Sequence, residues 1–118
     1  GYDRASGRIS NPEVFVDAGD IDGYPDGMTV DSEGHVWSAF WDGSAFHRFA
    51  PDGTRKRTVT LDPQKVSSLT FAGDDYGTAY VTTACVETRE TEGTGAGSLY
   101  CVDLGVTGRP EFRSAIDP

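Results

Sequence analysis

The residue with the clearest chemical potential in this sequence is Asp26, which lies in the run Tyr24-Pro25-Asp26-Gly27-Met28. A Pro-Asp-Gly segment favours a tight turn, and the apolar and β-branched residues that follow it predict a strand. The turn would hold one carboxylate at the entrance of that strand. A carboxylate in this place can bind a cation or accept a proton, or it can accept a hydrogen bond from the backbone of its own turn, which is a purely structural role.

The other residues with chemical potential are two cysteines and two histidines. Cys85 and Cys101 are too few and too far apart for a thiolate zinc site, which uses closely spaced cysteine pairs. Both are predicted on neighbouring strands, so a disulfide and two free thiols are the open alternatives. His35 and His47 lie on or beside predicted strands, and neither is assigned a catalytic role.

Composition limits the fold and the partners. The sequence contains 15 Gly and 6 Pro in 118 residues, which indicates many short elements joined by turns and favours an all-β fold. The net charge of −9 argues against nucleic acid or an anionic membrane as a partner and favours a small molecule or a cation. Because no apolar run reaches about 18 residues, we expect a soluble protein, cytoplasmic or otherwise.

A repeat of about forty residues organises the chain. The segment 27–31 matches 68–72, and 36–39 matches 79–82. A period of this length with several short strands in each unit predicts the blades of a β-propeller. The aromatic side chains of the first unit are predicted to fill the space between adjacent blades, with a ligand-stacking role for Trp41 as the alternative. The other members of this set are Trp37, Phe40, Phe46 and Phe49.

The turn signals divide the chain into three parts. Residues 1–22 are predicted to contain a linker and, at 13–16, an outer strand left from a preceding blade. Residues 23–62 are predicted to form one blade of four strands. Residues 63–118 are predicted to form a second blade with a long loop at 86–97, either a solvated excursion or a functional loop, and Glu111–Arg113 as a possible last strand. The remaining predicted strands begin near Met28 and Ser67 or lie at 37–41, 46–49, 57–61, 80–83 and 99–103.

Several segments together resemble one known family. In order along the chain, segments 23–31, 33–37, 48–53, 69–73, 79–84 and 95–108 resemble a stretch of the gluconolactonase, senescence-marker-protein and regucalcin family. The resemblance implies a six-bladed β-propeller, of which this chain would be the C-terminal portion and supply roughly three blades' worth: two near-complete blades and an outer strand. It also implies a divalent metal, such as calcium, zinc or manganese, held by a glutamate, two asparagines and the aspartate of the Pro-Asp-Gly turn.

By this resemblance Asp26 is both a metal ligand and the general base of a metal-dependent lactone hydrolase. The glutamate and both asparagines would lie upstream of Gly1, because the only asparagine here is Asn11, in a turn before the predicted outer strand. We therefore expect metal binding to be weak or absent in this chain alone. The expected partners are a small-molecule lactone and either the upstream N-terminal half of the propeller or a second copy of the chain.

The alternative function is a propeller unit that binds or supports other molecules without catalysis. Such a unit would keep the scaffold and lose the chemistry, because a fold alone does not confer activity. It could be a half-propeller that closes into a ring by homodimerisation.

Overall fold

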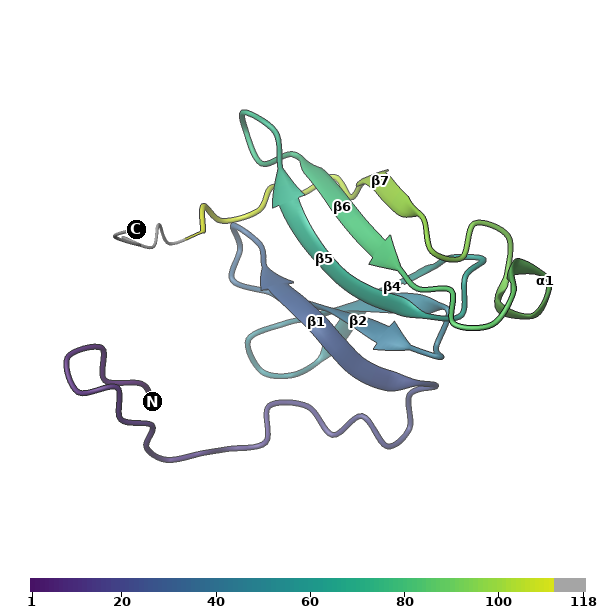
Figure 1. Ribbon diagram of the computed structural model, residues 1–118. Coiled ribbons are helices and arrows are strands. Elements are labelled where there is room, and N and C mark those ends of the chain that lie inside the picture. Colours follow the sequence, from purple (N-terminus) through teal and green to yellow (C-terminus); the bar gives the residue numbers. More distant parts are fainter. Residues whose placement is uncertain (112–118) are drawn as a thin grey trace, which may run out of the picture.

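The computed structural model describes residues 1–111 and contains two antiparallel β-sheets that pack against each other (Figure 1). In each sheet, strands that follow one another in the chain are hydrogen-bonded neighbours. The all-β prediction is therefore confirmed. The first sheet contains β1 (Tyr24–Val30), β2 (Val36–Trp41), β3 (Ala45–Phe49) and β4 (Arg55–Thr60); the second contains β5 (Val66–Ala72), β6 (Thr78–Thr83) and β7 (Leu99–Asp103). The single-turn helix α1 (Arg89–Glu92) lies in the long loop between β6 and β7.

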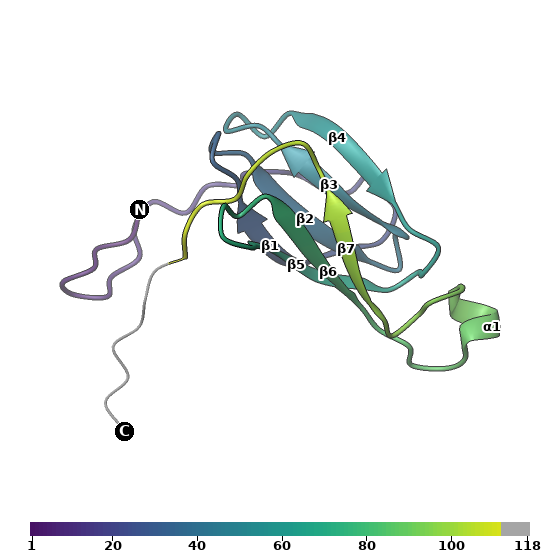
Figure 2. The ribbon, with the colours of Figure 1, turned by 90° about the horizontal axis from the view of Figure 1, so that it is seen from above.

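The hydrophobic core lies between the two sheets, which Figure 2 shows as stacked layers. Side chains alternate across a strand, so Trp37 and Ala39 of β2 face the second sheet. Trp37 is fully buried, with its ring centroid 5.7 Å from that of Phe46 and 6.4 Å from that of Phe71. A tryptophan buried between two blades is what the aromatic pattern predicted. The core also contains Val66, Leu69, Ala79, Val81 and Leu104.

The remaining aromatic residues of the first sheet have other surroundings. Phe40 and Phe49 are also buried and pack with their ring centroids 6.4 Å apart. They lie on the face of the sheet that points away from the core, because they alternate with Trp37 and Ala39. Trp41 is partly buried, and the Lys65 ammonium lies 5.8 Å from its ring centroid. That contact agrees with a packing role for Trp41.

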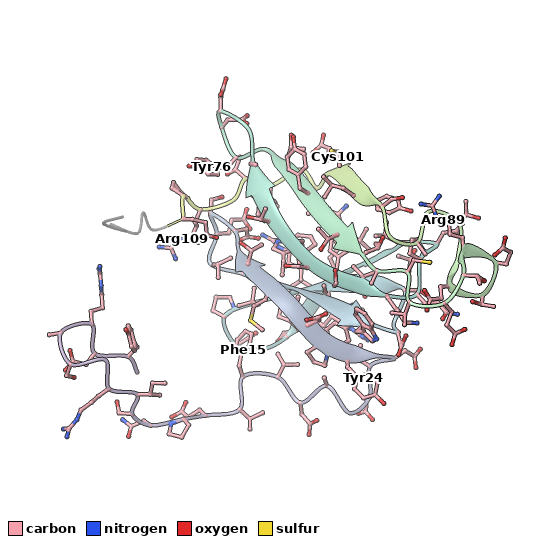
Figure 3. The ribbon with its side chains drawn as sticks, in the orientation of Figure 1. Phe15, Tyr24, Tyr76, Arg89, Cys101 and Arg109 are labelled. Carbon is pink, nitrogen blue, oxygen red and sulfur yellow. The ribbon has the colours of Figure 1, made fainter. Side chains whose placement is uncertain are left out.

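Residues 13–16 form no strand with the other described residues, and the predicted outer strand of a preceding blade stays a prediction. A strand needs a neighbour to satisfy its backbone hydrogen bonds, and none of the described strands lies beside this segment. The segment instead runs along the outward face of the first sheet, and Figure 3 shows Phe15 beneath β1. There it helps to line an apolar hollow of about 300 Å³ together with Met28, Phe40 and Phe49.

The end of the described chain returns toward the first sheet. Gly108 bridges to Asp31, and the Arg109 N–H donates to the Val30 carbonyl at 3.3 Å. Of the predicted last strand, Glu111 has no regular secondary structure, and residues 112 and 113 lie outside the described residues. Across residues 1–111, no helix is both long enough and apolar enough to span a lipid bilayer.

Both cysteines are free thiols and exposed. Cys101 lies opposite Tyr80 in the β6–β7 ladder. Cys85 lies past the end of β6, where its Cβ is close to Gly97. Of the two alternatives that the sequence left open, the structure therefore has two free thiols.

Candidate functional site

Asp26 lies on a β-bulge in β1. Pro25 pairs with Phe40 of β2, and farther along β1 both Asp26 and Gly27 lie opposite the single residue Ala39. The Pro-Asp-Gly segment is therefore part of the strand, which corrects the prediction of a turn ahead of it. Proline is tolerated here because β1 is the edge strand of its sheet. Bulges often occur beside active sites, where the extra residue re-aims a side chain.

The Asp26 carboxylate is exposed and, within residues 1–111, makes no hydrogen bond or ion pair. The structural role that the sequence left open, a hydrogen bond to its own turn, is therefore not formed. Six other aspartates do have that role, each accepting from the backbone N–H two residues later. They are Asp3, Asp17, Asp31, Asp52, Asp75 and Asp103.

The first strand of the second sheet repeats the bulge. Val66 pairs with Thr83 and Ser68 with Thr82, so Ser67 is an extra residue in β5. The Ser67 and Thr82 hydroxyl oxygens are 2.9 Å apart, and the Ser67 hydroxyl also donates to the Thr82 carbonyl at 3.2 Å. The Thr82 hydroxyl in turn lies 3.3 Å from the Ser68 carbonyl. The bulge in β5 therefore carries a pair of linked hydroxyls where the bulge in β1 carries a carboxylate.

The two bulges touch each other. Strands β1 and β5 lie side by side and run in the same direction (Figure 1). A Cβ atom added to Gly27 would lie 2.2 Å from the Ser68 Oγ and 2.8 Å from the Ser68 Cα, which is closer than Cβ atoms come to other atoms in real structures. Glycine at this position thus permits the close approach of the two strands.

The long loop between β6 and β7 is anchored at the end of the sheets where β1 begins. The Glu92 side chain is 2% exposed, with Oε1 2.7 Å from the Lys65 Nζ and Oε2 accepting from the Val86 N–H at 2.7 Å. Lys65 also reaches Asp42 Oδ1, at 3.2 Å, in the turn after β2. The hydrogen bond from Lys65 outweighs burial and lowers the pKa of Glu92. Sequence analysis missed this anchor because no local pattern links residues so far apart in the chain.

Two labelled side chains show that this loop and the start of β1 share one end of the molecule. In Figure 3, Tyr24 and Arg89 lie toward one end of the sheets, and Tyr76 and Arg109 lie toward the other. The same end carries Asp26 and the hydroxyl pair of Ser67, because both bulges are near the starts of their strands.

At the opposite end of β1, the next residue, Asp31, has a structural role. Asp31 is fully buried and accepts hydrogen bonds from the His35 N–H at 2.9 Å, the Trp37 indole N–H at 2.9 Å and the Arg48 Nε at 2.8 Å. It also accepts from the Glu33 N–H at 3.0 Å. Burial acts to raise the pKa of Asp31, but these hydrogen bonds outweigh it, so the pKa lies below its ordinary value.

The histidines and the acidic residues do not form a metal site within the described part of the chain. No group of three or more histidine, cysteine, aspartate or glutamate side chains among residues 1–111 is placed to hold an ion. Burial lowers the pKa of His47, whose Nδ1 lies 2.9 Å from the Thr58 hydroxyl. Calcium takes six to eight oxygen ligands and zinc about four ligands, so the unpaired carboxylate of Asp26 fits one ligand position only.

The comparison with known families decides the relationship. A family model described as the SMP-30/Gluconolactonase/LRE-like region matches residues 1–85. The chain belongs to this family. Among curated SMP-30/gluconolactonase/LRE-like proteins, the chain is 43% identical to pentonolactonase XacC of Haloferax volcanii, over 98% of this chain and 42% of that protein. It is 34% identical to regucalcin of Gallus gallus, over 97% of this chain and 40% of the relative.

Solved structures of the SMP-30/gluconolactonase/LRE-like family have the same architecture. A luciferin-regenerating enzyme superposes with a TM-score of 0.79 at 28% identity, over 92% of this chain and 38% of that one. A regucalcin of Agrobacterium tumefaciens, described as a calcium-binding protein, superposes with a TM-score of 0.76 at 29% identity, over 85% of this chain and 35% of that one. The two sheets are therefore blades of a β-propeller, and the chain spans about two fifths of the length of its relatives.

Proposed function

We propose that this chain is the C-terminal part of a metal-dependent lactone hydrolase, with Asp26 as metal ligand and general base. The observation that supports this role is the contrast among the aspartates. Six of them accept a backbone hydrogen bond in their own turn, whereas Asp26 is exposed and unpaired within residues 1–111. The lactonase names of two relatives, a pentonolactonase and a putative sugar lactone lactonase of Bacillus subtilis, support the reaction type.

The proposed reaction is hydrolysis of a cyclic ester. The oxygen of a water molecule attacks the lactone carbonyl carbon while the Asp26 carboxylate accepts a proton from that water. The bond between the carbonyl carbon and the ring oxygen then breaks, and the ring oxygen takes up a proton to give an open-chain hydroxy acid. A divalent cation such as calcium, zinc or manganese, when bound, would polarise the carbonyl and lower the pKa of the water.

The remaining ligands would come from a partner that completes the ring. The outward face of the first sheet supports such a partner, because Met28 is 63% exposed and Phe15 is 44% exposed beside the apolar hollow. The partner is either the upstream N-terminal half of the propeller or a second copy of this chain. Light scattering after size exclusion separates these arrangements, since a second copy doubles the mass of the isolated chain.

The test of the proposed function uses the chain in its complete assembly. With added calcium, zinc or manganese, we expect hydrolysis of an aldonolactone, its loss in Asp26→Asn, and a metal affinity in that variant at least about tenfold weaker. Asp52→Asn is the matched control, because Asp52 lies in a second Pro-Asp-Gly segment but bonds the Thr54 N–H at 2.9 Å. Calorimetry that shows equal metal affinity for both variants would contradict the assignment of Asp26.

A further inference from the structure

The internal repeat places Ser67 in β5 at the position that Asp26 has in β1. In the matching of 27–31 with 68–72, the residue before each segment is Asp26 in one blade and Ser67 in the other. The structure gives both residues the same position, since each is on the bulge of the first strand of its sheet. The contact between Gly27 and Ser68 keeps the two bulges at the same level.

The chemistry of Ser67 differs from that of Asp26. Its hydroxyl is held by the hydroxyl and the carbonyl of Thr82, at 2.9 and 3.2 Å. No histidine or carboxylate in residues 1–111 is hydrogen-bonded to it, so nothing there activates it as a nucleophile. When the Ser67 hydroxyl donates to the Thr82 carbonyl and accepts from the Thr82 hydroxyl, one of its two lone pairs stays free, and the partly exposed group can accept one more hydrogen bond. Such a group suits a neutral ligand that carries hydroxyls.

We infer that Ser67, held in place by Thr82, is a specificity-determining residue that accepts a hydrogen bond from a ring hydroxyl of a polyhydroxylated lactone. The inference rests on the proposed function, because it places the lactone carbonyl at Asp26. It extends that function by assigning substrate recognition to the neighbouring blade. Asp26 acts on the ester group, and Ser67 distinguishes a hydroxylated ring from a bare one.

The test compares two six-membered lactones with and without ring hydroxyls: glucono-1,5-lactone and δ-valerolactone. In the complete assembly, Ser67→Ala should lower kcat/KM about threefold to tenfold for glucono-1,5-lactone, mainly through KM, and leave δ-valerolactone unchanged. Thr82→Val, which keeps the shape of the side chain and removes its hydroxyl, should act in the same direction. Thr70→Ala is the control, because Thr70 is an exposed hydroxyl on the same strand, away from the bulge.

Two measurements separate this inference from the proposed function. Metal affinity should be unchanged in Ser67→Ala, and calorimetric binding of gluconate, which needs no turnover, should be weaker than in the unmodified protein. If Ser67→Ala affects both lactones equally or neither, and gluconate binding does not change, the inference is overturned while the lactonase proposal stands. An assembly that hydrolyses neither lactone but loses gluconate affinity in Ser67→Ala would overturn the proposed reaction and keep the binding role of Ser67.

Discussion

Pro25-Asp26-Gly27 and Pro51-Asp52-Gly53 are the same tripeptide, yet the first lies inside β1 and the second forms the turn between β3 and β4. In the turn, Gly53 has a φ of 82° and the Asp52 carboxylate accepts from the next residue but one. In the strand, pairing with β2 replaces the turn, and the Asp26 carboxylate is left unpaired among the described residues. Tertiary pairing, not local sequence, therefore decides which aspartate is available for chemistry.

Asp31 completes this comparison, because its buried carboxylate accepts four hydrogen bonds and should contribute strongly to the stability of the fold. We expect Asp31→Ala to lower the free energy of unfolding by about 3 to 5 kcal/mol, since the buried Trp37 indole would lose its acceptor, while the partly buried Arg48 guanidinium would keep Glu33 as its carboxylate partner. Denaturant unfolding of the complete assembly measures this change. Asp26→Ala is the paired variant, and a comparable loss of stability there would mean that Asp26 is structural as well.

Gly27→Ala tests whether the backbone, not a side-chain contact, positions Asp26. The added Cβ would press on Ser68, and we expect a loss of about 1 to 3 kcal/mol, typical of overpacking. Thermal unfolding of Gly27→Ala and of the double variant with Ser68→Gly measures the effect. Partial recovery of stability in the double variant supports the contact between the bulges, and purely additive losses speak against it.

The loss of stability at acidic pH should depend on Asp31. The pKa of Asp31 is lowered in the folded state, so its ionised form contributes stability above the ordinary pKa of about 3.9. That contribution is lost as pH falls from there through the lowered value. Unfolding midpoints measured between neutral pH and about pH 3 should therefore fall less steeply in Asp31→Asn than in the unmodified protein. An unchanged slope would mean that Asp31 is not ionised in its network.

The smallest effect is expected for Asp26 itself. Asp26→Asn should change the free energy of unfolding by no more than about 0.5 kcal/mol, because no described group depends on its carboxylate. Asp52→Ala should lower the unfolding midpoint slightly, because the Thr54 N–H loses its partner. Thermal unfolding of the two variants under the same conditions compares their midpoints. A larger loss in Asp26→Asn than in Asp52→Ala would mean that Asp26, and not Asp52, has the structural role.

Much of the fold was predictable from local patterns. Alternating apolar residues and turn signals located the seven strands of residues 1–111, and the repeat predicted the two blades. Residues 13–16 have the β-propensity of a strand but no neighbouring strand among the described residues, so their place in a preceding blade stays a prediction. At the site, the sequence indicated Asp26 but not the bulge around it, since the pairing of Pro25 with Phe40 is a long-range contact. The role inferred for Ser67 likewise needed the structural equivalence of the two bulges.

The anchoring of the long loop through Glu92 makes that loop an exchangeable module. Glu92 holds the loop to the sheets, since its side chain reaches Lys65 and its carbonyl accepts from the Gln64 N–H at 2.8 Å. At the other end of the loop, Ser98 is hydrogen-bonded to the Thr83 hydroxyl. Residues 87–91 are exposed. Their identity can therefore vary during evolution without disturbing the blade, as long as Glu92 and Lys65 are retained. New contacts at this end of the propeller can arise in that segment while the strands that carry Asp26 and Ser67 stay as they are.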